Sequence, residues 1–120
     1  LVEGNVITRV TDYFIQKTGT CIEHGLTDII LDPGFGFSKT PDQNFELIRS
    51  VPQLKLLGKP VLIGVSRKST IYKTLNCTPA EALNGTTVLH TAALLGGADI
   101  LRVHDVKEAM EAITLTRHLL

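Results

Sequence analysis

The fold is decided by the aliphatic stretch Pro60-Val61-Leu62-Ile63-Gly64-Val65-Ser66, which has no polar residue between its two ends. Similar stretches occupy residues 28–32 before it and 99–105 after it. Continuous apolar runs of this length are typical of parallel strands that are covered on both faces. The intervals between the three runs leave room for one helix after each strand.

Helix-start signals occupy those intervals. Thr40-Pro41-Asp42-Gln43 and Thr78-Pro79-Ala80-Glu81 each place a hydroxyl before a proline, with an amide or an acid three residues after the hydroxyl. This is the pattern of a capping box, and it predicts helices over 41–50 and 79–95. A looser signal, in which Asp105 is the helix cap, predicts a helix over 106–119.

An earlier helix is predicted over 5–24, ending at Gly25, because its apolar residues share one helical face: Ile7, Val10, Phe14 and Cys21. The order is therefore one helix followed by three strand–helix units, in a single partial domain over 1–120. This alternation predicts an α/β fold, either a doubly wound sheet or part of a (β/α)8 TIM barrel. A whole barrel needs about 250 residues, so the chain would be only part of one.

Composition removes two broad classes of function. The 120 residues are 43% hydrophobic and 20% charged, and their formal net charge is zero. Neutrality gives no general attraction for nucleic acid, and no apolar run is long enough to span a bilayer. We therefore expect a cytoplasmic globular protein without nucleic-acid or membrane partners. Because the chain starts at Leu1 and not at Met, we expect it to be a fragment.

Polar residues follow the carboxyl ends of the predicted strands, where α/β folds place their sites. Asp32 ends the first strand, where a carboxylate needs a partner or, alternatively, caps a turn. In the loop that follows, Phe35 and Phe37 are positioned to wall a pocket. The second strand ends in Ser66-Arg67-Lys68-Ser69, which is suited to an anion or carbonyl site or, alternatively, is a solvated turn.

The third strand carries Arg102 and His104, which are two residues apart and so project to the same face as Ile100, while Leu101 and Val103 face the helices. An arginine within an apolar strand needs an anionic partner. A ligand phosphate suits its planar guanidinium, and a salt bridge to an acid elsewhere in the chain is the alternative.

Three segments together resemble, in order and spacing, the last strand-end motifs of dihydropteroate synthases: Asp32-Pro33-Gly34-Phe35-Gly36-Phe37, Gly64-Val65-Ser66-Arg67-Lys68-Ser69 and Arg102-Val103-His104-Asp105. The resemblance covers essentially the whole chain and implies the C-terminal half of the family's TIM barrel, about strands six to eight. It implies a transferase of folate biosynthesis, targeted by sulfonamides, that joins 6-hydroxymethyl-7,8-dihydropterin diphosphate to p-aminobenzoate. The isolated chain is expected to be inactive, and either poorly stable or associated through its open edges and exposed interior face.

The resemblance also implies a role for each motif residue. Asp32 and Lys68 would bind the pterin, Arg102 and His104 would bind pyrophosphate, and Arg102, His104 and Lys68 would be catalytic. The p-aminobenzoate site would comprise Phe37, Arg67, Ser66 and Ser69. Mg2+ would accompany the pyrophosphate through ligands outside this chain, so no metal ligand is expected within it. The expected protein partner is a second copy in a homodimer, or the missing half of the barrel.

Two other functions fit part of the pattern. A pterin-dependent methyltransferase would share the barrel and the acidic pterin contact, but methyl transfer expels no pyrophosphate and gives no reason for Arg102 and His104. A non-catalytic homologue that acts by association would need neither of these residues, nor Asp32 and Lys68.

Overall fold

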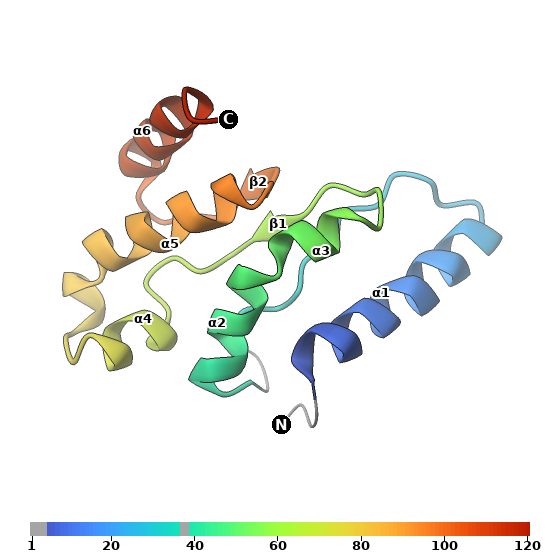
Figure 1. The fold of residues 1–120 in the computed structure, drawn as a ribbon, viewed down its shortest axis with the longest axis horizontal. Coiled ribbons are helices and arrows are strands. Elements are labelled where there is room, and N and C mark those ends of the chain that lie inside the picture. Colours follow the sequence, from blue (N-terminus) through green and yellow to red (C-terminus); the bar gives the residue numbers. More distant parts are fainter. Residues whose placement is uncertain (1–4, 37–38) are drawn as a thin grey trace.

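A short parallel sheet runs through the middle of the computed structural model, which describes residues 5–36 and 39–120 (Figure 1). Strand β1 (Leu62–Ile63) pairs with β2 (Ile100–Leu101), and a single parallel bridge joins Leu31 to Val61. Two of the three predicted strands are therefore present, shorter than expected, and the first predicted strand is reduced to the single bridge at Leu31. Neither Leu31 nor β2 has a further strand beside it among the described residues, so the residues with ladder partners there are Leu31, 61–63 and 100–101.

Local capping signals define the first two helices. Helix α1 (Val6–Glu23) begins after Asn5, whose side chain accepts hydrogen bonds from two backbone amides, and is followed by Gly25 at a φ of +84°. Helix α2 (Pro41–Arg49) begins at the predicted Thr40–Gln43 capping box. Both helices lie within a residue or two of their predicted bounds, because the signals that start them are local in sequence.

The remaining helices are less regular than predicted. The predicted helix over 79–95 is divided into a 3-10 turn, η1 (Pro79–Glu81), and helix α5 (Leu83–Leu95). The Thr78–Glu81 capping box is present, but it starts the 3-10 turn and not the long helix. Two short helices were not predicted, α3 (Val51–Lys55) and α4 (Ser69–Thr74), and the chain's last helix is α6 (Val106–Arg117).

One face of the sheet is covered by helices and the other is open. The side chains of Leu31, Val61 and Ile63 are buried in the hydrophobic core, whereas Ile30 is 55% and Ile100 is 36% exposed. The expectation that both faces are covered is therefore not met within the described residues. Within the same residues, no helix has both the length and the apolar character needed to cross a membrane.

Candidate active site at the open face

The polar residues of the three strand ends lie on the open face of the sheet. Val61, Ile63 and Val65 point into the core, so the residues between and after them, Gly64 and Ser66, face the other way. Along the third segment, Arg102 and His104 are exposed while Leu101 and Val103 are half-buried. The predicted alternation of this segment is confirmed, and it directs Arg102 and His104 to the face that carries Gly64 and Ser66.

Asp32 and Arg102 form an ion pair on this face. The Arg102 Nη1 donates to Asp32 Oδ2 at 2.8 Å, and the other carboxylate oxygen accepts a hydrogen bond from the Gly34 amide at 3.0 Å. Asp32 therefore both caps the turn after its strand and contacts a cation. For Arg102, the internal salt bridge that the sequence left as an alternative is present in the structure.

Gly64 allows this contact because Arg102 lies across it. A Cβ atom at position 64 would be 2.3 Å from Arg102 Nη2 and 2.8 Å from its Cζ, closer than non-bonded atoms approach. Sequence reasoning did not assign Gly64 a role. The signal was nevertheless there, because a glycine inside a strand indicates close approach by another group.

Lys68 adds a second cation to the open face. Its Nζ donates to the Phe35 carbonyl oxygen at 2.7 Å. Burial lowers the pKa of Lys68, the nearby charges of Arg102 and Lys39 lower it further, and Asp32 opposes them. Three cations and one carboxylate thus lie within electrostatic reach of each other, which favours binding of an anion.

Lys39 is a member of this group that the sequence analysis missed. Its Nζ donates to the Gly34 carbonyl oxygen at 2.9 Å, and burial lowers its pKa while the charge of Asp32 raises it. A lysine directly after a glycine-containing loop carries no specific sequence signal. Only the folded loop places it beside Asp32.

The loop after Asp32 is held by a buried amide. The Asn44 Oδ1 accepts from the Gly36 amide at 2.9 Å, and the Asn44 Nδ2 donates to Thr70 Oγ1 at 2.8 Å. Asn44 and Thr70 are both buried. Sequence analysis missed Asn44 as well, although its spacing from Leu47 places it on the apolar face of α2, where a polar residue needs a specific partner.

Phe35 does not wall a pocket, contrary to expectation. Its side chain is 1% exposed and belongs to the hydrophobic core, and only its carbonyl oxygen serves the site, as the acceptor for Lys68. Phe37, which was predicted to line the p-aminobenzoate site, lies outside the described residues.

Ser66 and His104 form a second contact on the open face. The Ser66 Oγ lies 2.8 Å from His104 Nδ1 and also accepts a hydrogen bond from the His104 amide at 3.2 Å. Ser66 is buried, His104 is exposed, and Ser69 is a half-buried residue at the start of α4. The structure thus places five of the predicted site residues on one face, in two contact groups. Asp32, Lys68 and Arg102 form one group and Ser66 and His104 the other, and we call the five together the rim cluster.

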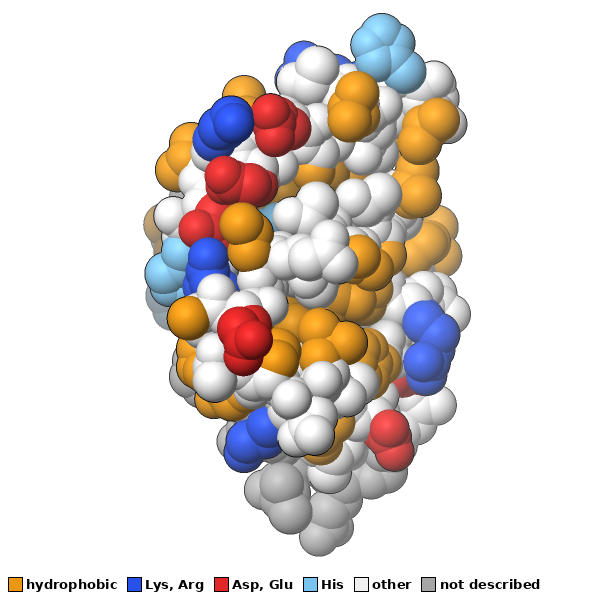
Figure 2. All heavy atoms as spheres, turned by 90° about the vertical axis from the view of Figure 1, so that its left-hand side faces the viewer, with side chains coloured by type: hydrophobic (Ala, Val, Ile, Leu, Met, Phe, Trp, Pro, Cys, Tyr) orange, Lys and Arg blue, Asp and Glu red, His pale blue; other side chains and the backbone are white. Residues whose placement is uncertain are grey.

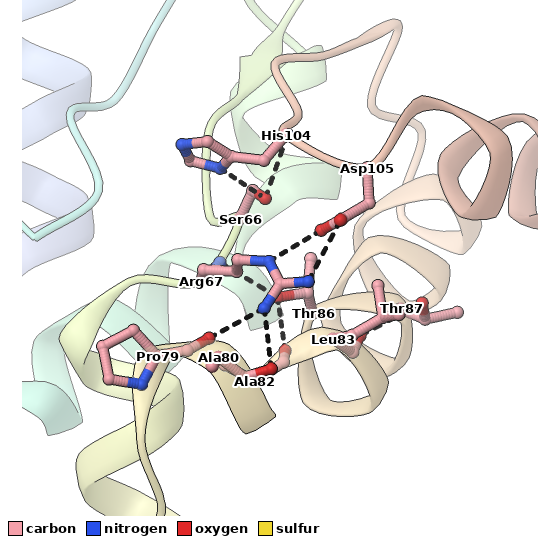
Figure 3. Close-up of polar contacts among 10 residues, drawn as sticks. All are labelled: Ser66, Arg67, Pro79, Ala80, Ala82, Leu83, Thr86, Thr87, His104 and Asp105. Atoms are coloured by element: carbon pink, nitrogen blue, oxygen red, sulfur yellow. Dashed lines mark hydrogen bonds and ion pairs between the residues drawn. The ribbon is translucent and has the colours of Figure 1, made fainter.

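Arg67 is directed away from Ser66 and His104 and toward Asp105 (Figure 3). Its Nε and Nη2 donate to the two carboxylate oxygens of Asp105 at 2.8 and 3.0 Å. The expectation that Asp105 is a helix cap needs correction, because Asp105 is at the N-cap position of α6 but makes no side-chain cap bond. A bidentate guanidinium is a stronger partner for a carboxylate than one backbone amide, and these hydrogen bonds lower the pKa of Asp105.

No metal site can be built from the described part of the chain, in which no three His, Cys, Asp or Glu side chains are grouped as metal ligands are. The one carboxylate of the rim cluster, Asp32, is held by Arg102. We therefore assign no step to a metal ion bound by these residues.

Comparison with known proteins identifies the family. The profile described as "Pterin binding enzyme" matches residues 1–104, and the chain belongs to this family. It is 40% identical over 111 residues to the dihydropteroate synthase of Escherichia coli K12 and 46% identical over 113 residues to that of Synechocystis. These alignments cover 91% and 92% of the chain but 39% of each relative.

Solved structures agree with this assignment. The chain superimposes on Yersinia pestis dihydropteroate synthase with a pterine-sulfa conjugate at a TM-score of 0.95, with 32% identity over 98% of this chain and 48% of that one. A dihydropteroate synthase from Coxiella burnetii in complex with pteroic acid gives 0.91, with 36% identity over 94% and 44% of the two chains. The prediction that the chain is part of a TIM barrel is confirmed, and it spans less than half the length of these relatives.

Proposed function

We propose that this chain supplies part of the active site of a dihydropteroate synthase, namely the residues at the ends of its three strand segments. The complete enzyme joins 6-hydroxymethyl-7,8-dihydropterin diphosphate to p-aminobenzoate and releases pyrophosphate. The observation that carries the proposal is the meeting of Asp32, Lys68 and Arg102, from three separate strand ends, on one open face. A carboxylate with three nearby cations suits a substrate that has an amino-substituted ring at one end and a diphosphate at the other. The pterine-sulfa and pteroic acid complexes of the relatives support the same substrate class.

In pterin binding, Asp32 and Arg102 would separate and contact different parts of the substrate. In this proposal Asp32 accepts hydrogen bonds from the amino-pyrimidine edge, and Lys68 donates to ring acceptors from its position at the Phe35 carbonyl. Arg102 exchanges the Asp32 carboxylate for an oxygen of the diphosphate. Because the side chains of Asp32 and Arg102 are 36% and 52% exposed, neither is locked in the pair by burial.

The chemistry is a substitution at the pterin methylene carbon. The bond from this carbon to the bridging oxygen breaks, and its electron pair leaves with the pyrophosphate. The nitrogen of p-aminobenzoate then forms a bond to the carbon and loses a proton. Arg102 and His104 stabilise the charge that develops on the leaving group, and the other residues align the amine with the carbon.

The p-aminobenzoate carboxylate would be received by Ser66 and Ser69, which flank the turn into α4. The aliphatic part of Arg67, the Lys68 stem and Phe37 would flank its aromatic ring. The Arg67 guanidinium is held by Asp105, so only its stem is assigned to the ring. A sulfonamide, which mimics p-aminobenzoate, would compete for the same position.

The proposal also covers the location of the protein in the cell, its metal ion and its oligomeric state. We place the protein in the cytoplasm and expect Mg2+ to bind with the diphosphate, through ligands supplied outside this chain. We expect a homodimer formed through the C-terminal helices. Figure 2 shows hydrophobic side chains on the side of the molecule formed by α4, α5 and α6. The exposed hydrophobic residues of these helices include Val88, Met110 and Leu115.

The isolated chain should associate through its exposed apolar surfaces, with another copy or with the missing part of the barrel. Size-exclusion chromatography with light scattering tests this expectation on residues 1–120 alone. A monomer that melts in one sharp, cooperative transition would contradict it.

The activity is tested on the completed barrel, meaning this chain joined to the N-terminal half from its own full-length protein or from the Escherichia coli relative. With both substrates present, we expect release of pyrophosphate and formation of dihydropteroate, both lost in Asp32→Asn. A folded barrel that binds a pterin but releases no pyrophosphate would overturn the proposal and favour a non-catalytic homologue. Methyl transfer from a methylated folate would favour the methyltransferase.

A further inference from the structure

The Arg67–Asp105 ion pair joins the two segments that carry four of the five rim-cluster residues. Ser66 and Lys68 lie on one segment, and Arg102 and His104 lie on the other. Arg67 is the residue between Ser66 and Lys68, and Asp105 directly follows His104. The pair is bidentate, and the two side chains are 24% and 23% exposed. It therefore sets the position of the segment that carries Ser66 and Lys68 relative to the segment that carries His104.

Arg67 is held on its other side as well. Its Nη1 donates to the carbonyl oxygens of Pro79 and Ala80 at 2.8 and 3.0 Å, so the guanidinium lies between Asp105 and the start of η1 (Figure 3). With both carboxylate bonds, these contacts use all three nitrogens of the guanidinium. A side chain with its polar atoms so engaged is a fixed structural element and has little capacity left to bind a ligand.

The backbone of Arg67 needs this support. Its φ of +53° is in the left-handed region, which is unfavourable for a residue with a Cβ. The Arg67 amide donates to Thr86 Oγ1 at 2.9 Å, and the Thr86 hydroxyl in turn donates to the Ala82 carbonyl at 2.7 Å. The left-handed turn sends Arg67 toward Asp105 while Ser66 contacts His104 on the open face.

The contacts of the predicted pterin site do not include Asp105. Asp32 is held by Arg102 and by the Gly34 amide, and Lys68 is held by the Phe35 carbonyl. The position of Ser66 depends more directly on Asp105, because the Ser66 hydroxyl contacts His104, which is the neighbour of Asp105 in the sequence. Loss of the Arg67–Asp105 pair should therefore disturb Ser66 more than it disturbs Asp32 or Lys68.

We propose that Asp105 is a positioning residue for the p-aminobenzoate site, acting through Arg67 on the turn that presents Ser66. The inference rests on the proposed function and deepens it. It assigns Asp105 to substrate affinity, although the carboxylate touches no substrate itself. The titratable groups near the pair are His90, His104 and Glu108, which act on it only through longer-range electrostatics and do not replace it.

Kinetics of the completed barrel test the inference. Asp105→Ala should raise the KM for p-aminobenzoate about tenfold while leaving the KM for the pterin diphosphate within about twofold. His104 is the one residue assigned to the diphosphate that shares the Ser66 contact, whereas Arg102 keeps its own contact with Asp32. Asp105→Asn, which keeps one acceptor oxygen, should give an intermediate KM and covers the case in which the alanine variant does not fold. Arg67→Ala should raise the same KM by at least as much, because it also removes the stem that flanks the aromatic ring. The double variant should be no worse than Arg67→Ala alone, because both changes break the same ion pair.

The matched control is Asp99→Ala, which breaks an ion pair with Lys55 at the other end of the same strand segment. It should lower the melting temperature and leave both KM values within about twofold. If Asp105→Ala raises both KM values equally, or leaves the p-aminobenzoate KM unchanged, Asp105 has no positioning role. If the unaltered barrel forms no dihydropteroate, the proposed function itself fails, and this inference fails with it.

Discussion

Arg102 and Asp32, which are 70 residues apart in the sequence, are joined by a 2.8 Å contact that passes over Gly64. In the proposed reaction the two groups bind opposite ends of one substrate. The ion pair therefore keeps each group near its working position and neutralises a carboxylate that would otherwise repel the diphosphate. Substrate binding replaces this contact with two others.

Replacement of Arg102 should affect the diphosphate and spare the ring. We expect Arg102→Ala to lower kcat/KM for the pterin diphosphate by roughly 100-fold or more, as removal of a group that stabilises transition-state charge does. Binding of the same pterin without its diphosphate, measured by calorimetry, should change little. Arg49→Ala removes an arginine from a solvent-exposed ion pair on α2 and is the matched control. It should change neither kcat/KM nor pterin binding. Equal losses for both pterins would contradict the assignment.

The Gly64→Ala variant tests whether the close approach of Arg102 matters. A methyl group there would collide with the guanidinium, so Arg102 should be displaced and kcat/KM should fall as it does in Arg102→Ala. Gly19→Ala is the control, because a Cβ at this position in α1 meets no atom of the described part of the chain within 4 Å. It should stabilise the protein by about 0.5–1 kcal/mol, since glycine is unfavourable within helices. Normal activity in Gly64→Ala would show that the Arg102 guanidinium can reach its working position without passing over residue 64.

The buried Asn44 should contribute to the stability of the loop after Asp32. Asn44→Ala removes the partners of the Gly36 amide and the Thr70 hydroxyl, and we expect a cost of about 1–3 kcal/mol in the free energy of unfolding. Urea denaturation of the completed barrel measures it. Asn84→Ala removes the same side chain from an exposed position on α5 and should cost far less. Equal costs for the two variants would mean that the Asn44 bridge adds nothing.

His90 should make the protein less stable in acid. Its ring is buried, its Nε2 has no hydrogen-bond partner among the residues that the structure describes, and burial lowers its pKa against a smaller opposing effect of Asp105. The unfolded chain then binds a proton at a pH where the folded chain does not, so stability falls as the pH drops through the unfolded pKa of about 6.5. The urea concentration at the midpoint of unfolding should decrease as the pH is lowered from about 7.5 to about 5.5.

His90→Leu should reduce this acid sensitivity, because leucine fills similar space without titrating. His118→Leu removes an exposed histidine and should leave it unchanged. A midpoint in His90→Leu that falls as steeply with pH as in the unaltered protein would assign the sensitivity to other groups.

What could be predicted from the sequence was what depends on local signals or on strand topology. Thr40 and Gln43 define the start of α2 by contacts within four residues, and the carboxyl ends of parallel strands bring Asp32 and Arg102 to one edge whatever the loops do. The partner of Arg67 could not be predicted in this way. It is 38 residues away, and the direction of the side chain depends on a left-handed φ that nothing in Ser66-Arg67-Lys68 indicates.

The side chain of Phe35 illustrates the same limit. An aromatic residue between two glycines after a strand suits either a pocket wall or the core, and only the packing of α2 and the sheet decides between them. Asn44 was missed for a related reason, because its partners, Gly36 and Thr70, lie in two other segments that only the fold brings to it.

The crowding of cations around Lys68 ties substrate affinity to solution acidity. Its pKa is lowered partly by Arg102 and Lys39, and a diphosphate that settles among these groups would offset their repulsion and bring the pKa back up. Arrival of the substrate is then accompanied by net proton uptake whenever the medium is alkaline enough to deprotonate part of the lysine. Affinity for the diphosphate should therefore weaken as the buffer becomes more basic, without any change in the charge of the ligand.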